Sequence, residues 1–347
     1  MEDLRAVFLA HYDRYPKSQI QDFVKLAYQS TFGPGHMISN PASARAYLQY
    51  ETAVAPSTPW QTTLESIGSG FYRMHLGATR DYSVDAIAAL FFLTAAVKTG
   101  SQEALIDKLR VIVQLSKEEK LPCDAEAWIL AYRASGCPAI HHSKTYREAY
   151  APAYRVVSES ALRVLPMLRE IDRLLRERDT VTVAIEGSSA SGKSLLGKVI
   201  ADAYDANLFH MDDFFLRPEQ RTPERFAQPG GNIDYERFRR EILVPLGQNV
   251  PFDYRVFDCS TMDFGGSVTV RPKKLRIVEG AYSRHPFFGD PYDLKIYLGV
   301  DPVTQSERIR ARNGERMLKR FLSEWIPYEN AYFAAYNVIN SSDFVIL

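Results

Sequence analysis

The chain has 347 residues, 46% of them hydrophobic, and its 42 Lys and Arg residues are balanced by 42 Asp and Glu residues. This length and composition are typical of a globular protein with two domains. Because the formal net charge is zero, no overall field draws the chain to nucleic acid or to an anionic membrane, and we expect neither as a partner.

The sequence favours a cytoplasmic location. Its first segment, MEDLRAVFLAHYDRY, is acidic where a signal peptide is basic. The longest apolar run, AIAALFFLTAAV, is too short to cross a bilayer and reads as a buried helix. The cysteines Cys123, Cys137 and Cys259 are widely spaced and form no CxxC pair. We therefore expect a reduced protein without structural disulfides or a zinc site.

The first half of the chain is dominated by apolar residues at the 3.6-residue period of helices. Asn40 is a candidate helix cap, and Pro41 occupies a first helical position. Only residues 66–76, SIGSGFYRMHL, indicate a strand or an ordered loop. We expect a mostly α-helical domain over residues 1–176, with helices at roughly 2–14, 19–31, 42–53, 83–98, 101–119, 124–135 and 153–177.

From Thr180 onward, short β-rich runs alternate with helical patterns, which is typical of a parallel sheet with helices on both faces. The second half is therefore predicted to be an α/β domain over residues 177–347. The string DFGG at 263–266 lacks the companion motifs of protein kinases and GTPases, and it indicates a tight turn in a hairpin. The expected strands are 180–187, 207–211, 275–280, 294–300 and 344–347. One helix is expected from Gly192 and another at about 235–248. A third is expected from Pro302, followed by a long helix that ends near 336.

The segment GSSASGKS matches the phosphate-binding pattern G-x-x-x-x-G-K-[ST], with an apolar strand before it and a helical pattern after it. Its backbone N–H groups would hold phosphate oxygens. Lys193 would reach the β- and γ-phosphates, and the Ser194 hydroxyl would bind Mg²⁺. We therefore predict ATP, in preference to GTP, and Mg²⁺ as cofactors. The predicted nucleotide site comprises Gly187, Ser188, Ser189, Ala190, Ser191, Gly192, Lys193 and Ser194.

Two other apolar strands end in acidic residues. Asp212 follows a strand that we expect beside the phosphate-loop strand, where its carboxylate could accept the proton of an attacking hydroxyl or bind the metal. For the adjacent Asp213, a loop cap and a substrate contact are both open. Glu279 ends the strand RIVEG and would orient Mg²⁺ or its water shell.

Residues from about 180 to 347 resemble the uridine kinase and phosphoribulokinase group of P-loop kinases. The resemblance covers half the chain and rests on the order of GSSASGKS, HMDDFF, VEG, DPVTQSERIRARN and FLSEWIPYENAYF. It implies that Asp212 is the catalytic base, with Lys193 on the phosphates, and that Glu279 lies beside the metal. It also implies that Arg308 and Arg312 belong to an arginine-rich lid that neutralises charge in the transition state.

The presumed substrate region departs from that family. Uridine kinases carry Pro-x-Tyr-Asp and a downstream His, whereas this chain has PFDYRVFDCS, and its segment 217–238 is long and rich in arginine. Asp234 could bind a sugar or polyol and Tyr254 could stack on a ring, while Arg255 suggests an anionic group on the substrate. The expected partner is therefore a small molecule with a hydroxyl group, a nucleoside or another metabolite.

Histidine and arginine residues near glycines in the first half suggest a second anion site formed by His36, Arg73, His75 and His142. The alternative, that these side chains make buried packing contacts, is equally open. Similar helical segments occur fused to uridine-kinase-like domains in bacteria, and this resemblance implies no activity.

Taken together, the sequence predicts a Mg²⁺-ATP-dependent phosphotransferase that acts on a hydroxyl group. Two alternatives are an ATP-binding switch that controls what the helical domain binds, and a bifunctional enzyme whose helical domain modifies the same metabolite. A homo-oligomer is left open.

Overall fold

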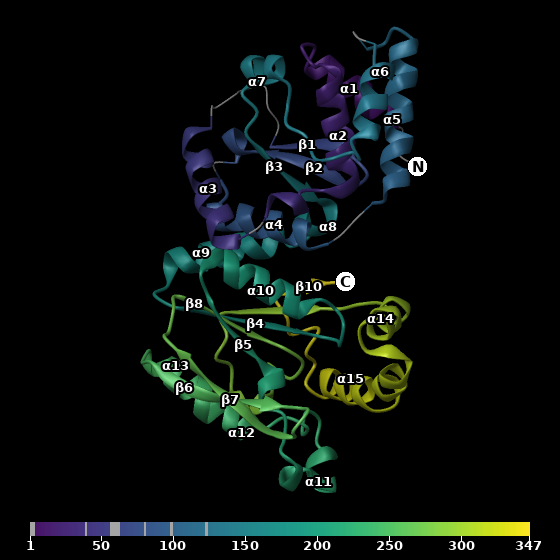
Figure 1. The fold of residues 1–347 in the computed structure, drawn as a ribbon. Coiled ribbons are helices and arrows are strands. Elements are labelled where there is room, and N and C mark those ends of the chain that lie inside the picture. Colours follow the sequence, from purple (N-terminus) through teal and green to yellow (C-terminus); the bar gives the residue numbers. More distant parts are fainter. Residues whose placement is uncertain (1–3, 39, 56–62, 80, 98–99, 122–123) are drawn as a thin grey trace. The chain divides into compact units, whose positions relative to one another are not determined.

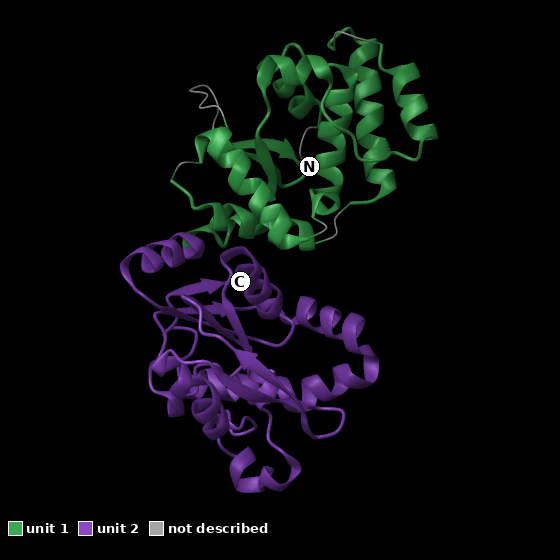
Figure 2. Ribbon diagram, turned by 60° about the vertical axis from the view of Figure 1, so that its left-hand side comes forward, with its two compact units in different colours: residues 1–166 green, residues 167–347 purple. Residues whose placement is uncertain are grey.

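The computed structural model describes residues 4–38, 40–55, 63–79, 81–97, 100–121 and 124–347. The chain divides into two compact units, Met1–Pro166 and Met167–Leu347 (Figure 2). Cys137 and Cys259 are free thiols, and Cys123 lies outside the described residues, as do the first positions of the helix expected at 2–14 and the last position of the one expected at 83–98.

Unit 1 packs helices around a three-stranded antiparallel sheet of order β1-β2-β3 (Figure 1). The strands are β1 Leu64–Gly68, β2 Phe71–His75 and β3 Tyr154–Ser158. The helices are α1 Leu4–Arg14, α2 Ile20–Phe32, α3 Pro41–Val54, α4 Val84–Ala96, α5 Gln102–Lys117, α6 Glu126–Ala134, α7 Lys144–Tyr150 and α8 Glu159–Leu162. The mostly helical first half and the strand expected within 66–76 are thus confirmed.

The predicted continuous helix at 153–177 is wrong in its first part. Tyr154–Ser158 instead forms β3, which pairs with β2 so that Tyr154 lies opposite His75. The β-branched residues Val156 and Val157 are buried in this strand, a position that suits their restricted side chains. Only the later residues are helical, in α8 and in α9 Leu165–Glu177.

The cap and core residues of unit 1 agree with the local sequence signals. The side chain of Asn40 accepts a hydrogen bond from the Ser43 N–H at 3.0 Å and so caps α3, which begins at Pro41. The apolar run AIAALFFLTAAV forms most of α4, and residues 86–92 are all buried. Within the described part of the chain, no helix is both long enough and apolar enough to cross a bilayer.

Unit 2 is built on a five-stranded sheet of order β10-β9-β4-β8-β5 in which every pairing is parallel. The strands are β4 Val181–Gly187, β5 Asn207–His210, β8 Leu275–Glu279, β9 Leu294–Leu298 and β10 Phe344–Ile346. Every residue of β8, and every residue of β4 except Thr182, is buried, as expected of central strands covered on both faces. This α/β fold, with helices flanking the sheet, is the predicted one and is consistent with a P-loop kinase fold.

The remaining elements of unit 2 lie on and around this sheet (Figure 1). The antiparallel hairpin of β6 Phe252–Asp258 and β7 Asp263–Val270 lies beside α12 and α13. The string DFGG therefore opens β7 rather than forming the turn, which lies at 259–262. The helices are α10 Lys193–Tyr204, α11 Pro223–Phe226, α12 Tyr235–Phe238, α13 Val244–Gln248, α14 Pro302–Arg320 and α15 Ile326–Ala335. The π-helical turn Arg239–Leu243 joins α12 to α13, and the π-helical turn Phe321–Trp325 joins α14 to α15.

Candidate functional site

The phosphate loop connects the end of β4 to the start of α10. Gly187 has φ +154°, and a Cβ atom there would lie 2.2 Å from the carbonyl oxygen of Leu298, so this position requires glycine. Gly192 has φ +103°, in the left-handed region that favours glycine. The two glycines fold the chain into a loop before the N-terminus of α10, where backbone N–H groups and the helix dipole favour an anion.

The predicted loop residues fall into two groups. Ser189, Ala190, Gly192, Lys193 and Ser194 line a large cavity of unit 2. Gly187, Ser188 and Ser191 do not line it. Gly187 packs on Leu298 and the Ser188 hydroxyl lies 3.1 Å from that of Tyr297, both on β9, and the Ser191 N–H donates to the Ser188 carbonyl oxygen.

Ser194 and Glu279, two of the three predicted metal residues, lie together, and the third, Asp212, lines the same cavity as Ser194. The Ser194 hydroxyl donates to Glu279 Oε2 at 3.1 Å, and Glu279 is only 4% exposed. The Nδ1 atom of His210 lies 2.5 Å from the other carboxylate oxygen, and this hydrogen bond raises the pKa of His210. Among the described residues, no three His, Cys, Asp or Glu side chains form a metal site by themselves. A Mg²⁺ ion held by Ser194 and Glu279 would therefore take its other ligands from phosphate and water.

Asp212 lies in the 3₁₀ turn Met211–Phe214 after β5 and lines the same cavity as Lys193. The expectation that β5 is the direct neighbour of β4 is wrong, because β8 lies between them. Both strands nevertheless end at the same edge of the sheet, which brings Asp212 to the phosphate loop. Burial raises the pKa of Asp212 against the opposing charge of Lys193.

The cavity measures about 820 Å³. Arg308 and Arg312 of α14 both line it, and Arg308 Nη1 donates to the Ala190 carbonyl oxygen at 3.0 Å. The two predicted lid arginines therefore border the place where the loop would hold phosphates. The aromatic lining residues, which the sequence did not single out, are Phe215, Phe226, Tyr282, Phe321, Trp325 and Tyr328.

Glu329 is a residue of the loop environment that the sequence reasoning missed. It is 5% exposed on α15, and its carboxylate accepts hydrogen bonds from the N–H of Ser189, at 2.9 Å, and from the Ser189 hydroxyl. Burial raises the pKa of Glu329, opposed by the charge of Lys193. An acidic residue among the aromatic residues of FLSEWIPYENAYF was the available signal.

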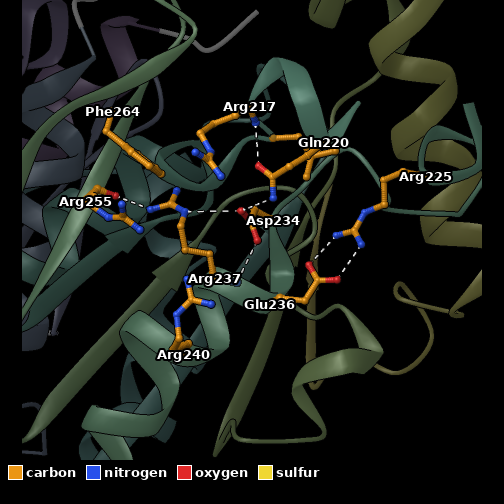
Figure 3. Close-up of a pocket in the computed structure, with 10 residues that line it drawn as sticks. Arg217, Gln220, Arg225, Asp234, Glu236, Arg237, Arg240, Arg255 and Phe264 are labelled. Atoms are coloured by element: carbon orange, nitrogen blue, oxygen red, sulfur yellow. Dashed lines mark hydrogen bonds and ion pairs between the residues drawn. The ribbon is translucent and has the colours of Figure 1, made fainter. Parts of the chain in front are cut away.

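The four predicted substrate residues do not line this cavity. Asp213 and Tyr254 contact each other, since the Tyr254 hydroxyl donates to Asp213 Oδ2 at 3.2 Å. Asp234 caps α12 by accepting from the Arg237 N–H at 3.0 Å, and with Arg255 it lines a separate pocket (Figure 3). The polar and sulfur-containing residues of the segment 217–262 that line the nucleotide cavity are instead Arg221, Asn232, Cys259 and Met262.

In unit 1 the structure gathers three of the four residues predicted for a second site. Arg73 lies over the ring of Tyr154 at 4.7 Å, His142 Nε2 is 2.6 Å from the Tyr154 hydroxyl, and the His75 ring is 5.9 Å from the Tyr154 ring. Arg73 and His75 belong to β2 rather than to a loop. His36 does not contact the other three and packs edge-on against Tyr28.

Two buried carboxylates form hydrogen bonds and ion pairs with this cluster. Glu65 lies 2.8 Å from His75 Nε2 and 3.8 Å from Arg73 Nη1. Asp22 lies 2.8 Å from His142 Nδ1. All five side chains are buried, and Arg73 is 0% exposed. The cluster therefore resembles a structural network that compensates buried charge, and a second ligand site remains a prediction.

Unit 1 is expected to lose stability as the pH falls from 7 to 4.5. Burial lowers the pKa of His11 from 6.5 to about 4 and that of His142 to about 3. At pH values between these lowered pKa values and 6.5, the two histidines are protonated in the unfolded chain and neutral in the folded unit. The free energy of unfolding therefore falls as the pH falls. With about 1.4 kcal/mol per pKa unit, the loss is on the order of 3 kcal/mol for each histidine. Urea unfolding of unit 1 at the two pH values measures it.

The matched variants for this experiment are His11→Phe and His141→Phe. His11 stacks on Tyr146 in the core, where a phenyl ring preserves the shape and removes the titration, whereas His141 is exposed. The pH dependence should shrink in the first variant and persist in the second. Equal stability of the unmodified protein at both pH values would show that these histidines are not held neutral.

Comparison with known proteins adds little to this description. No family model and no curated protein matches the chain. A solved structure provisionally named a uridine kinase, from Bacillus stearothermophilus, is 19% identical, with a TM-score of 0.38 over 52% of this chain and 100% of that one. Another, provisionally named a fructose transport system kinase, from Silicibacter sp. TM1040, is 23% identical, with a TM-score of 0.42 over 50% of this chain and 92% of that one. Both scores are low, and neither structure informs the activity of this chain.

Proposed function

We propose that unit 2 is a Mg²⁺-ATP-dependent phosphotransferase that transfers the γ-phosphate to a hydroxyl group of a small molecule. The observation that carries this proposal is the position of Asp212, whose carboxylate shares one cavity with Lys193 and the phosphate loop. In a nucleotide-binding switch a carboxylate at this place would serve only the metal, so loss of phosphate transfer with retained nucleotide binding in Asp212→Asn distinguishes the two functions.

In the proposed reaction the acceptor oxygen attacks the γ-phosphorus, and the bond from that phosphorus to the β,γ-bridging oxygen breaks, so that ADP leaves. The proton of the acceptor hydroxyl passes to the Asp212 carboxylate. The raised pKa of Asp212 makes this carboxylate a stronger base than an ordinary aspartate.

The other residues of the cavity would bind and orient the phosphates. Lys193 would contact the β- and γ-phosphate oxygens, and Arg308 and Arg312 would neutralise the charge that develops during transfer. A bound Mg²⁺ ion would supply Lewis-acid neutralisation of the phosphate charge. Ser194 and Glu279 would hold it.

The acceptor would occupy the part of the cavity beyond Asp212. Phe215 and Met262 offer apolar contact there, while Arg221 and Asn232 offer hydrogen-bond donors. This lining suits a small metabolite with both an apolar part and polar substituents.

The proposal is tested by measuring γ-phosphate transfer from Mg²⁺-ATP to nucleosides, sugars, hydroxy acids and vitamin precursors, with Lys193→Ala as the blank. We expect at least one acceptor to react with the unmodified protein and none with the variant. The matched control is Lys198→Ala, because Lys198 lies one turn later in α10, pairs with Asp202 and does not line the cavity. ATP binding without transfer to any acceptor would favour the switch that controls unit 1.

A further inference from the structure

A second pocket of unit 2, of about 490 Å³, is rich in arginine (Figure 3). It is formed by the long segment 217–238, the helical residue Arg240 and the hairpin β6–β7. It shares no lining residue with the nucleotide cavity, since Phe215 lines that cavity whereas Leu216 lines this pocket. The side chains that matter here are Arg217, Arg225, Arg237, Arg240, Arg255 and Phe264.

Three of these arginines gather around one aromatic ring. The guanidinium carbons of Arg217, Arg237 and Arg255 lie 5.2, 5.0 and 4.0 Å from the centroid of the Phe264 ring, and Figure 3 shows the three groups close together. The ring attracts each cation, but the three like charges repel one another. An anion between them would remove that repulsion.

Two of these three arginines each have a buried N–H group without a hydrogen-bond acceptor among the described residues. Arg237 is 2% exposed, yet its Nε–H has no hydrogen-bond partner and lies 3.9 Å from the nearest carboxylate oxygen, that of Asp234. The buried Nε–H of Arg217 also has no acceptor. Burial lowers the pKa of Arg237, so its surroundings do not fully compensate its charge. Unpaired buried donors are costly, and their presence indicates a missing acceptor.

The carboxylates nearby do not fully balance the five arginines, although Glu219 lies 2.9 Å from Nη1 of Arg217. Glu236 is held by both terminal nitrogens of Arg225, at 2.7 and 2.8 Å. Glu241 is shared by three arginines, at 2.8 Å from Arg255, 3.4 Å from Arg237 and 3.5 Å from Arg240. The side chains of Arg240 and Arg255 are 66% and 50% exposed, so they can turn toward a ligand.

We propose that this pocket binds a small metabolite with phosphate or carboxylate groups, as a ligand additional to the nucleotide and the acceptor. Guanidinium groups bind both kinds of oxyanion through paired hydrogen bonds. The volume of the pocket lies in the range of small-molecule sites and exceeds the needs of a single inorganic ion.

The pocket is connected to the reacting end of the nucleotide cavity. Arg237 Nη2 donates to the carbonyl oxygen of Asp213, the residue that follows Asp212. An anion that accepts hydrogen bonds from Arg237 would compete with the Asp213 carbonyl oxygen for this side chain. It would thereby shift the 3₁₀ turn that carries Asp212. This coupling, unlike the binding itself, rests on the proposed phosphotransferase function.

The test is calorimetric titration of the full chain with inorganic phosphate and, separately, with citrate. A non-hydrolysable ATP analogue with Mg²⁺ is present in excess, so that the phosphate loop is occupied. We expect saturable binding of at least one probe, and the two arms distinguish phosphate from carboxylate recognition. The double variant Arg240→Gln, Arg255→Gln should weaken binding at least tenfold, because it removes two cations and their charge-assisted hydrogen bonds to the ligand.

The matched control is Arg173→Gln, which removes an exposed arginine on α9 that pairs with Glu170 and Glu177. It should bind the probes as the unmodified protein does. Absence of saturable binding with the analogue present, or equal binding by the double variant, would overturn the proposal. Lys193→Ala separates the two hypotheses, since it should abolish phosphate transfer and leave citrate binding unchanged.

Discussion

Replacement of Asp212 by Asn is expected to lower the turnover number for phosphate transfer by about 10²–10⁴-fold, the usual contribution of a general base. Asn keeps the shape of the side chain but cannot accept the proton of the acceptor hydroxyl. Binding of Mg²⁺-ATP should be retained, because Lys193 and the loop N–H groups remain in place. Single-turnover rates and the Kd of the nucleotide, measured on the same protein, separate the two effects.

The control variant for Asp212 is Asp213→Asn. This neighbouring carboxylate accepts a hydrogen bond from Tyr254 and does not line the cavity, so its replacement should change the turnover number much less. Because burial raises the pKa of Asp212, the activity of the unmodified protein should fall with decreasing pH already above the usual range of aspartate. A turnover number within threefold of the unmodified protein in Asp212→Asn would refute the role as base. Loss of nucleotide binding would instead indicate that Asp212 holds the metal.

Replacement of Glu65 by Gln is expected to lower the free energy of unfolding of unit 1 by about 3–5 kcal/mol, the cost of leaving a buried charge without its partner. Glu65 is the one carboxylate within 4.0 Å of an Arg73 nitrogen among the described residues, and Arg73 is completely buried. Glu65 also accepts a hydrogen bond from the Tyr15 hydroxyl, and its carboxylate lies 2.8 Å from Nε2 of His75. Because Gln preserves the volume of the side chain, the loss of stability measures the effect of removing the negative charge of Glu65.

Urea unfolding measures this effect when it is followed in unit 1 alone. A Trp325→Phe background removes the tryptophan of unit 2, so that the remaining tryptophan fluorescence, excited selectively at long wavelength, comes from residues 1–166. Glu118→Gln is the matched control, because Glu118 pairs with Arg5 at the surface, and exposed pairs contribute about 0–1 kcal/mol. A loss of similar size in both variants would mean that Arg73 is compensated by other groups.

The parts of the fold that could be predicted are those whose signals are local. Strands β4, β8 and β9 are short apolar runs that end in, or are followed directly by, glycine or an acid, and α10 follows a loop whose glycines have defined backbone requirements. Strand β3 could not be predicted in this way. Its residues YRVVS precede a helical pattern, and only their pairing with β2, far away in the sequence, makes them a strand.

The same distinction holds for the candidate site. Lys193, Asp212 and Glu279 come together because parallel strands end at one edge of the sheet, a relation that strand patterns alone imply. Asp234 and Arg255 were expected near them, yet they line another pocket, because the packing of α12 and of the hairpin β6–β7 depends on tertiary contacts rather than on local sequence signals. The contact of Glu329 with the loop depends on how α15 packs, 140 residues after Ser189.

The order of the strands in unit 2 also bears on how the protein acquires its structure during synthesis. Strand β4 carries the phosphate loop, and both of its partners, β8 at 275–279 and β9 at 294–298, come much later in the chain. The loop strand therefore has no partner on either side until most of unit 2 has left the ribosome. The three strands of unit 1 are complete at Ser158, before β4 is made. Unit 1 can therefore fold while unit 2 is still being translated, and the nascent β4 is the segment most in need of protection from aggregation.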